Sequence, residues 1–217
     1  MRDRIRDAAG RGGHAQDVTI VAVTKTFGPD AVVAAARAGL ADVGENKVQE
    51  ALVKMDAVHE RLRWHLIGHL QRNKAKWARR FALIHAVDSV RLADALDAAG
   101  REDAGREPLD VLLQVNVAGE ATKGGFALHE VEAEAERLVG LTGLRVTGVM
   151  TMAPFDASES VLRATFTGAR DARSTLRSAG HPATTLSMGM SQDYEIAVEE
   201  GATMVRLGTT LFGTRAT

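Results

Sequence analysis

The sequence predicts an α/β protein built as a closed (β/α)8 barrel of the TIM type, and three observations support this fold class. Short apolar runs alternate with longer segments of helical periodicity along most of the chain. There are eight such runs, and eight βα units in series are typical of a closed barrel. Runs such as VTIVAV, at residues 18–23, are apolar on both faces, as in a parallel sheet covered by helices. A doubly wound open sheet is the alternative.

Each predicted strand is a mainly apolar run that is too short for a helix. In chain order, the strands are expected at Thr19–Thr24, Ala41–Val43, Trp64–Ile67, Leu83–Ala86, Leu109–Val117, Arg145–Met150, Thr184–Leu186 and Met204–Leu207.

The intervals between the strands carry apolar residues at helical spacing. The predicted helices are Pro29–Ala38, Lys47–Glu60, Asn73–Arg80, Arg91–Ala99, Leu128–Val139, Ser158–Ala179 and Gln192–Glu199. Before the first strand there is room for one short helix, Asp3–Ala9, and the turn-rich stretch Ala99–Pro108 predicts a surface loop. We expect residues 1–217 to form a single domain.

Composition limits the partners and the compartment. The formal net charge is -1, so no strong field attracts nucleic acid or an anionic membrane. The absence of cysteine excludes disulfides, thiolate metal sites and cysteine nucleophiles, and favours an intracellular protein. The charged N-terminal stretch MRDRIRDAAGRGG lacks the apolar core of a signal peptide or anchor. We therefore expect a cytoplasmic protein without membrane or nucleic-acid partners.

Polar residues follow the predicted strands at the end of the barrel where such folds carry their chemistry. They are Lys25, Gly44-Glu45-Asn46, Gly68-His69, Asn116, Met150-Thr151, Ser187-Met188 and Arg206. Lys25 comes one residue after an apolar run. A lysine amine with little water around it loses proton affinity and can attack an aldehyde to form a Schiff base. A strand-end lysine that extends into solvent is the alternative.

Two segments near the C-terminus predict a phosphate site. The segment LSMGMSQDYE places Ser191 as N-cap before Gln192, with its hydroxyl and the first helical N–H groups facing an anion. In RLGTTLFG, Gly208 lets the backbone approach a ligand and Thr209 offers a hydroxyl. Barrels of this kind frequently build phosphate sites from the loops after strands seven and eight. Ordinary capping of two helices is the alternative.

Arg206 lies one step inside the last predicted strand, where a guanidinium needs a partner. That partner is either a carboxylate such as Glu45 or the ring nitrogen of a bound heteroaromatic cofactor. A cationic donor at a pyridine nitrogen keeps the ring unprotonated and weakens its capacity to accept carbanion electrons.

Other patterns favour structural interpretations. His65 and His69 lie on a strand and its end without a third ligand nearby, so we expect no metal site. The basic segment Gln71–Arg80 could contact RNA, but a solvated outer helix is the preferred interpretation. The segment GEATKGGF lacks the order of a P-loop, and Glu45 has no second carboxylate at a useful spacing. Solvated side chains are expected for Lys47, Lys54, Lys74, Lys76 and Lys123.

From Thr19 to Gly213 the chain resembles the pyridoxal phosphate homeostasis protein family, also described as proline-synthase co-transcribed or alanine racemase N-terminal-domain-like. The segments that carry the resemblance are VAVTK, GENKVQE, WHLIGHLQRNK, VNVAGEATKGGF, GVMTMAP and LSMGMSQDYEIAVEEGATMVRLGTTLFG. The resemblance implies the barrel of the alanine racemase N-terminal domain, with pyridoxal 5'-phosphate as cofactor. It also implies a Schiff base at Lys25, Asn46 beside the cofactor, and Arg206 at the pyridine nitrogen. The phosphate would lie on Ser191, Gly208 and Thr209.

Three functions agree with these residues. The first is a monomeric binding protein for vitamin B6 and amino-acid homeostasis, which holds pyridoxal phosphate and passes it to apoenzymes. The second is an amino-acid racemase or related enzyme. It would need a second acid–base group, for which Tyr194 is poorly placed, and we expect no C-terminal racemase domain because the sequence ends at Thr217. The third is a Schiff-base aldolase acting on phosphorylated sugars.

Overall fold

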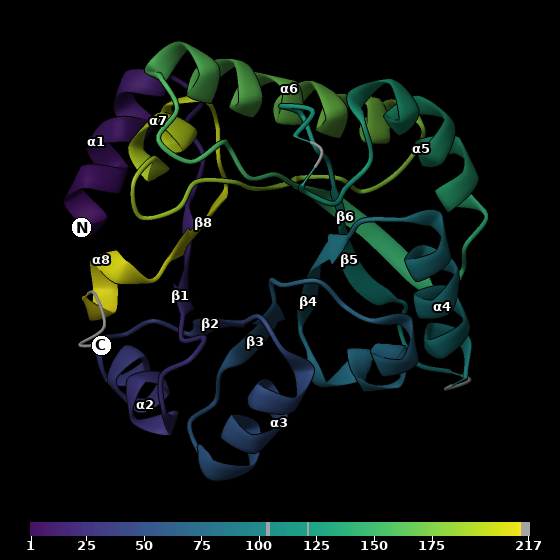
Figure 1. Cartoon of the computed structure of the whole chain (residues 1–217), viewed down its shortest axis with the longest axis horizontal. Helices are drawn as coiled ribbons and strands as arrows, with labels where there is room; N and C mark the ends of the chain where they lie inside the picture. The colour runs from purple at the N-terminus through teal and green to yellow at the C-terminus, as the bar shows by residue number, and fades with distance from the viewer. Residues whose placement is uncertain (103–104, 121, 214–217) are drawn as a thin grey trace.

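The computed structural model describes residues 1–102, 105–120 and 122–213, and its eight parallel strands form a closed barrel in the order β1 to β8 (Figure 1). The strands are β1 (Thr19–Val23), β2 (Asp42–Glu45), β3 (Arg63–Leu66), β4 (Leu83–Val87), β5 (Leu109–Gln114), β6 (Leu144–Met150), β7 (Thr185–Ser187) and β8 (Met204–Leu207). Pairing of β8 with β1 closes the barrel, with Val21 opposite Arg206. The predicted (β/α)8 barrel is confirmed, and the open sheet is excluded.

Helices surround the strands, as the period of their apolar residues predicts. They are α1 (Arg2–Gly12), α2 (Pro29–Arg37), α3 (Val48–Ala57), the 3₁₀ helix η1 (Arg72–Arg80), α4 (Val90–Arg101), the 3₁₀ helix η2 (Leu128–Glu130), α5 (Val131–Val139), α6 (Glu159–Ser178), α7 (Tyr194–Glu199) and α8 (Thr209–Phe212). None of the helices in the described ranges combines the length and apolar character that crossing a bilayer requires.

Two groups of buried side chains make up the core. The larger group lies between the strands and the surrounding helices and includes Phe166, Leu96 and Leu176. The smaller group is contributed by five different strands, which places it inside the barrel: Val21, Leu83, Ala86, Leu112, Met150 and Met204. Both faces of the strands are therefore buried, which explains their near-continuous apolar sequences.

Several predicted boundaries are wrong for identifiable reasons. The second strand extends over Asp42–Glu45, because both of its acidic residues are buried and paired inside the molecule. The predicted loop from Ala99 is helical as far as Arg101, and residues 103–104 lie outside the description. The fifth strand stops at Gln114 because Val115 bridges to Phe126.

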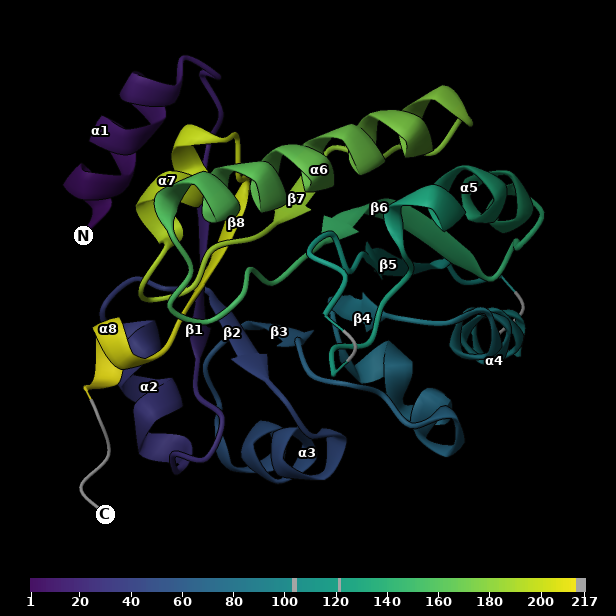
Figure 2. The ribbon, with the colours of Figure 1, turned by 45° about the horizontal axis from the view of Figure 1, so that its top comes forward.

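The N-terminal helix is longer than predicted and packs on α7 outside the barrel (Figures 1 and 2). Arg11 donates to Glu199 at 2.6 Å, and Arg4 pairs with Glu195. Gly12 permits the close approach, since a Cβ at this position would lie 2.2 Å from the carbonyl oxygen of Glu199. Charged α1 is thus held by complementary carboxylates of α7.

Candidate functional site

Lys25 lies in the turn directly after β1. The turn is closed by Phe27 N–H donating to the carbonyl of Thr24 at 3.1 Å, and Thr26 has a left-handed φ of 72°. Lys25 itself is exposed, and among the described residues its amine has no hydrogen-bond or ion-pair partner. The expectation of an amine with little water around it is therefore wrong for this structure, although the position at the barrel mouth is as predicted.

A buried ion cluster lies beneath this turn. The ammonium of Lys54, in α3, donates to Thr24 O at 2.8 Å, to Glu45 Oε1 at 2.7 Å and to Glu50 Oε1 at 2.9 Å. Thr24 Oγ1 also donates to Glu45 Oε1, at 2.6 Å, and Thr26 N–H donates to Glu50. The cluster thus holds the backbone on both sides of Lys25. The prediction that Lys54 is solvated is wrong, because only 3% of its surface is exposed.

The two carboxylates of this cluster respond oppositely to their surroundings. Burial raises the pKa of Glu45, and the hydrogen bonds from Lys54 and Thr24 only partly oppose this. Burial also acts to raise the pKa of Glu50, but hydrogen bonds from Lys54 and the Thr26 N–H outweigh it, and the pKa is lowered. Glu45 is thus the carboxyl whose charge is most costly in this cluster.

Arg206 projects into the barrel from β8 and is 5% exposed. Its Nη1 donates to Ser187 O at 2.7 Å and to Ser187 Oγ at 2.6 Å, and its Nη2 donates to Thr151 O at 2.8 Å. Burial lowers the pKa of Arg206 to about 10, and the charge of Asp193 opposes that shift, so the guanidinium is still cationic at neutral pH. The alternative in which Glu45 pairs with Arg206 is wrong.

Three of the five N–H donors of the Arg206 guanidinium meet an acceptor among the described residues, and one of the two that remain is on Nε. In the part of the chain that the structure describes, Nε has no hydrogen-bond acceptor, whereas both Nη atoms are occupied. A planar guanidinium that is held at both Nη atoms presents the N–H of Nε in a fixed direction. Arg206 can therefore donate to a ligand without rearranging.

The loops after β7 and β8 meet at Ser191. Its Oγ accepts the N–H of Gly208 at 3.3 Å and the N–H of Thr210 at 3.2 Å, so its own hydrogen is free for an acceptor. Thr209 begins α8 and is exposed. The N–H groups of Gly208 and Thr210 are therefore occupied by Ser191, whereas the Ser191 hydroxyl hydrogen lies beside the start of α8 without an acceptor among the described residues.

Ser191 is not the N-cap that the sequence pattern predicts. The N-cap of α7 is Asp193, whose buried carboxylate accepts the N–H of Met190. Burial raises the pKa of Asp193, and the Met190 N–H and the charge of Arg206 act in the opposite direction. Gly189, with a φ of 91°, makes the turn possible, because a Cβ there would lie 2.7 Å from the side chain of Ala197. Asp193 therefore shapes the turn and leaves the Ser191 hydroxyl available.

Asn46 follows β2, next to β1 in the barrel. It is half-buried, and its side-chain amide makes no hydrogen bond to the described residues. Gly68, after β3, packs against its backbone, since a Cβ at Gly68 would lie 2.5 Å from Asn46 O. Because β8, β1 and β2 are adjacent, Arg206, Lys25 and Asn46 lie at neighbouring positions around the same barrel end.

The residues of the competing sequence patterns make structural contacts of their own. His65 is bonded to Asp42 and His85 inside the barrel, whereas His69 is exposed and bonded to Asp88. Over residues 1–102, 105–120 and 122–213, no group of three His, Asp or Glu side chains could hold a metal ion. The basic segment forms the outer helix η1, whose Ala75 and Ala78 are buried.

Tyr194 begins α7 and points to α1, where the guanidinium of Arg4 lies 5.6 Å from the ring centroid. Burial raises the pKa of its phenol.

Sequence reasoning identified the strand-end residues but missed the roles of Lys54, Glu50 and Asp193. Their signal was weak, because a charged residue on a helix usually faces solvent.

Comparisons with known proteins agree over the whole described chain. The family model for the N-terminal domain of alanine racemase matches residues 1–216. The pyridoxal phosphate homeostasis protein of Pseudomonas aeruginosa is 43% identical over 215 residues, which cover 98% of this chain and 91% of that protein. The corresponding protein of Aquifex aeolicus is 39% identical over 217 residues, covering 98% and 94%.

Solved structures give the same result. PipY of Synechococcus elongatus PCC7942, solved with PLP bound, is 36% identical, with a TM-score of 0.83 over 96% of this chain and 100% of that chain. Alanine racemase from Corynebacterium glutamicum is 18% identical, with a TM-score of 0.75 over 99% of this chain and 62% of that chain. At that identity the likeness to the racemase concerns the fold alone.

Proposed function

Because the chain belongs to the family of pyridoxal phosphate homeostasis proteins, we propose that it binds pyridoxal 5'-phosphate through Lys25 and serves vitamin B6 homeostasis. The observation that carries the proposal is the buried Arg206, fixed by Ser187 and Thr151 with Nε left over, on the strand that pairs with the strand leading to Lys25. A buried cation with an unused, aimed donor fits a ring nitrogen better than a flexible sugar chain. That favours the cofactor over the phosphorylated sugar of an aldolase.

The residues present fit each part of this cofactor. Pyridoxal phosphate supplies an aldehyde that condenses with an amine with loss of water, and a pyridine ring that withdraws electrons. Lys25 is the exposed amine at the barrel mouth, and Asn46 offers an unused amide beside it. In this proposal Ser191, Gly208 and Thr209 hold the phosphate, with the free hydroxyl hydrogen of Ser191 and the start of α8 as donors, while the Gly208 N–H donates to Ser191 Oγ and positions that hydroxyl.

A binding role is favoured over amino-acid chemistry. Arg206 keeps the ring nitrogen unprotonated, which limits electron withdrawal. The second candidate function, racemisation, requires another acid–base group opposite the lysine. Tyr194, the single tyrosine, points to α1 instead. We propose that residues 1–217 act as one monomeric cytoplasmic domain that stores the cofactor and passes it to apoenzymes.

The test is replacement of the proposed anchor. Lys25→Ala should remove the yellow absorption of protein incubated with pyridoxal phosphate while leaving the far-UV circular dichroism unchanged, because Lys25 is exposed and contributes nothing to the core. Borohydride reduction of the wild type should place a pyridoxyl mass on the peptide that contains Lys25. Lys47→Ala is the matched control, an exposed lysine in the next loop. Full colour in a folded Lys25→Ala protein, or a wild type that takes up no cofactor, would overturn the proposal.

A further inference from the structure

A chain of hydrogen-bonded side chains runs through the barrel interior from Arg206. Arg206 Nη1 contacts Ser187 Oγ at 2.6 Å, and Ser187 Oγ contacts His85 Nδ1 at 2.9 Å. His85 Nε2 is 2.9 Å from His65 Nδ1, and His65 Nε2 is 2.9 Å from Asp42 Oδ1. All five residues are buried, with at most 5% of their surface exposed. Such a network is maintained only if each donor meets an acceptor.

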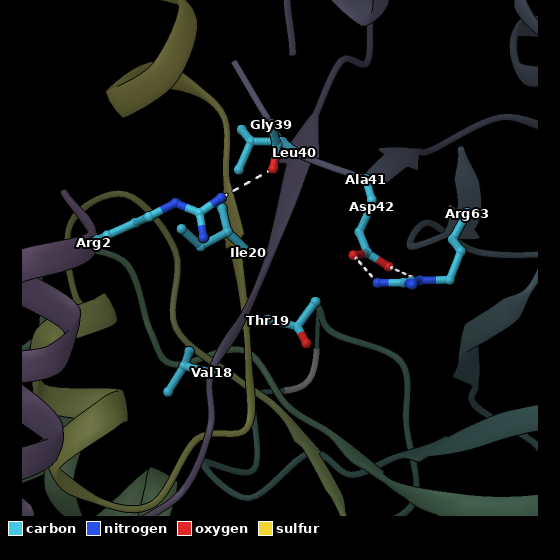
Figure 3. A pocket seen from close by; sticks show the side chains of 9 residues that line it. All are labelled: Arg2, Val18, Thr19, Ile20, Gly39, Leu40, Ala41, Asp42 and Arg63. Atoms are coloured by element: carbon cyan, nitrogen blue, oxygen red, sulfur yellow. Dashed lines mark hydrogen bonds and ion pairs between the residues drawn. The ribbon is translucent and has the colours of Figure 1, made fainter. Parts of the chain in front are cut away.

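The far end of the chain is anchored by Arg63, whose Nε donates to Asp42 Oδ1 at 2.7 Å and whose Nη2 donates to Oδ2. Figure 3 shows this ion pair on one side of a pocket of about 250 Å³, with Arg2 on the opposite side and Thr19 between them. Thr19, Asp42 and Arg63 are the first residues of β1, β2 and β3. The row of hydrogen-bonded side chains therefore begins at the barrel end opposite Lys25.

The charges at the two ends determine where the hydrogens lie. Arg206 can only donate, so Ser187 Oγ accepts from it and gives its single hydrogen to His85 Nδ1. His85 then carries its hydrogen on Nε2 and donates to His65, which in turn donates from Nε2 to Asp42. Burial and, to a smaller extent, the charge of Arg206 lower the pKa of His85 well below its ordinary value, which agrees with a neutral ring. Although burial opposes it, hydrogen bonds from His65 and Arg63 lower the pKa of Asp42, which agrees with a carboxylate.

The direction of these hydrogen bonds matters for Arg206 because the hydroxyl of Ser187 lies between Arg206 and His85. With its hydrogen given to His85, Ser187 Oγ can present only lone pairs to the guanidinium. Without an acceptor at His85, the hydroxyl hydrogen can rotate toward Arg206, where it would face another donor. The guanidinium would then lose one of the contacts that fix its plane, and with it the direction of Nε.

The structure assigns to His85 a function as a positioning residue for Arg206, acting through the hydroxyl of Ser187, with His65 and Asp42 fixing the orientation of the chain. The inference rests on the proposed function, since the group that Arg206 is aimed at is the pyridine nitrogen of pyridoxal phosphate. His85 touches neither that ring nor Lys25; it sets the geometry and hydrogen-bonding state of the residue that does.

The first test uses the protein without cofactor. Long-range ¹H–¹⁵N spectra of histidine-labelled wild type should show His65 and His85 as neutral rings that both carry hydrogen on Nε2, with slowly exchanging N–H signals. A hydrogen on Nδ1 of His85 would mean that His85 donates to Ser187, and this reversed hydrogen-bond direction would overturn the assignment. This measurement stands apart from cofactor binding, so its failure is distinguishable from failure of the proposed function.

The second test compares His85→Phe with His85→Asn, using pyridoxal phosphate labelled with ¹⁵N in the ring. Phenylalanine removes the acceptor, so the dissociation constant should rise about tenfold, the equivalent of one hydrogen bond to a charged group. The ring ¹⁵N resonance should also move toward that of a protonated pyridine as the pH is lowered.

Asparagine keeps an acceptor near the position of Nδ1, so His85→Asn should retain the wild-type ring resonance and bind within about threefold of wild type. His129→Phe, an exposed histidine of η2, is the control for histidine replacement itself. Wild-type affinity and ring resonance in a folded His85→Phe protein would overturn the inference, as would loss of both in His85→Asn.

Discussion

Lys54 shows how a single buried cation can fix a turn that carries the proposed anchor of the cofactor, Lys25. Its ammonium joins the carbonyl of Thr24 to two carboxylates, and one of these, Glu50, accepts the N–H of Thr26. The peptide groups on both sides of Lys25 are therefore bound to one cluster. Burying an ion pair stabilises a fold only when its partners are complete, and here Lys54 has three acceptors.

Replacement of Lys54 by methionine should therefore damage both stability and cofactor attachment. Methionine matches the length of the side chain but leaves Glu45 buried without its cation, which should cost about 3–5 kcal/mol of unfolding free energy. Urea unfolding measures this cost, and the rate of colour development with pyridoxal phosphate measures how well Lys25 is held. Lys76→Met, at an exposed lysine of η1, should change neither. Equal unfolding midpoints for the two variants would contradict the account of the cluster.

The strand-end residues were predictable because a barrel places its functional groups at one end. The cluster around Lys54 was not. Glu50 and Lys54 are four residues apart on a helix, which is the usual pattern of a solvated surface pair, and only the fold shows that they face the loop after β1. The His65 and His85 contact was equally hidden, since it joins neighbouring strands across twenty positions of sequence.

At the scale of elements, the contact between α1 and α7 determines which substitutions α1 can accept. α1 carries two glycines with opposite surroundings: a Cβ at Gly12 would meet Glu199 O at 2.2 Å, whereas a Cβ at Gly10 would meet nothing within 4 Å. The first glycine is thus required by the contact between the helices, and the second only weakens the helix.

Gly12→Ala should therefore lower the unfolding free energy by about 1–3 kcal/mol, because α1 must move away from α7. Gly10→Ala should raise it by about 0.5–1 kcal/mol through helix propensity. Thermal unfolding followed by circular dichroism distinguishes the two signs. Both variants should retain cofactor, since α1 lies outside the barrel mouth. A destabilised Gly10→Ala protein would show that the packing of α1 has been misread.

Most element boundaries followed from apolar periodicity, and β2 is an exception that depends on polar residues. β2 contains Asp42 and Glu45, and the predicted strand Ala41–Val43 stops short of Glu45, because isolated acidic residues are rarely buried. Each is buried because partners on other elements complete it: Arg63 and His65 for Asp42, and Lys54 for Glu45. Pairing of this kind depends on the tertiary structure and leaves no local pattern.

For the whole molecule, the pKa shifts of the carboxylates determine how the free energy of unfolding depends on pH. Hydrogen bonds from Arg163 and Arg11 lower the pKa of Glu199, and Arg163 and Arg170 outweigh burial to lower that of Glu200. A carboxyl whose folded pKa is depressed stabilises the fold above its unfolded pKa, near 4.5, and loses this contribution as the pH falls through the folded pKa.

The urea midpoint should therefore decrease as the pH is lowered from about 4.5 toward 3. Glu45 and Asp193 act with the opposite sign, because their pKa values are raised and protonation relieves the cost of a buried charge. The midpoint should accordingly hold steady or rise slightly as the pH falls from neutral toward about 4.5. Glu199→Gln should make the acid decrease shallower. An unchanged wild-type midpoint between pH 5 and 3 would contradict this assignment.

The pairing of β8 with β1 also has a consequence during synthesis of the chain. Lys25 extends the first strand, whereas Arg206 belongs to the last and Gly208 follows it, so the proposed binding groups lie on both sides of the seam that closes the barrel. A nascent chain that has not yet emerged past its eighth strand has the anchoring amine but no counterpart for ring or phosphate. If these residues bind the cofactor as proposed, its capture follows synthesis of β8, and the bound molecule connects the first and last strands of the barrel.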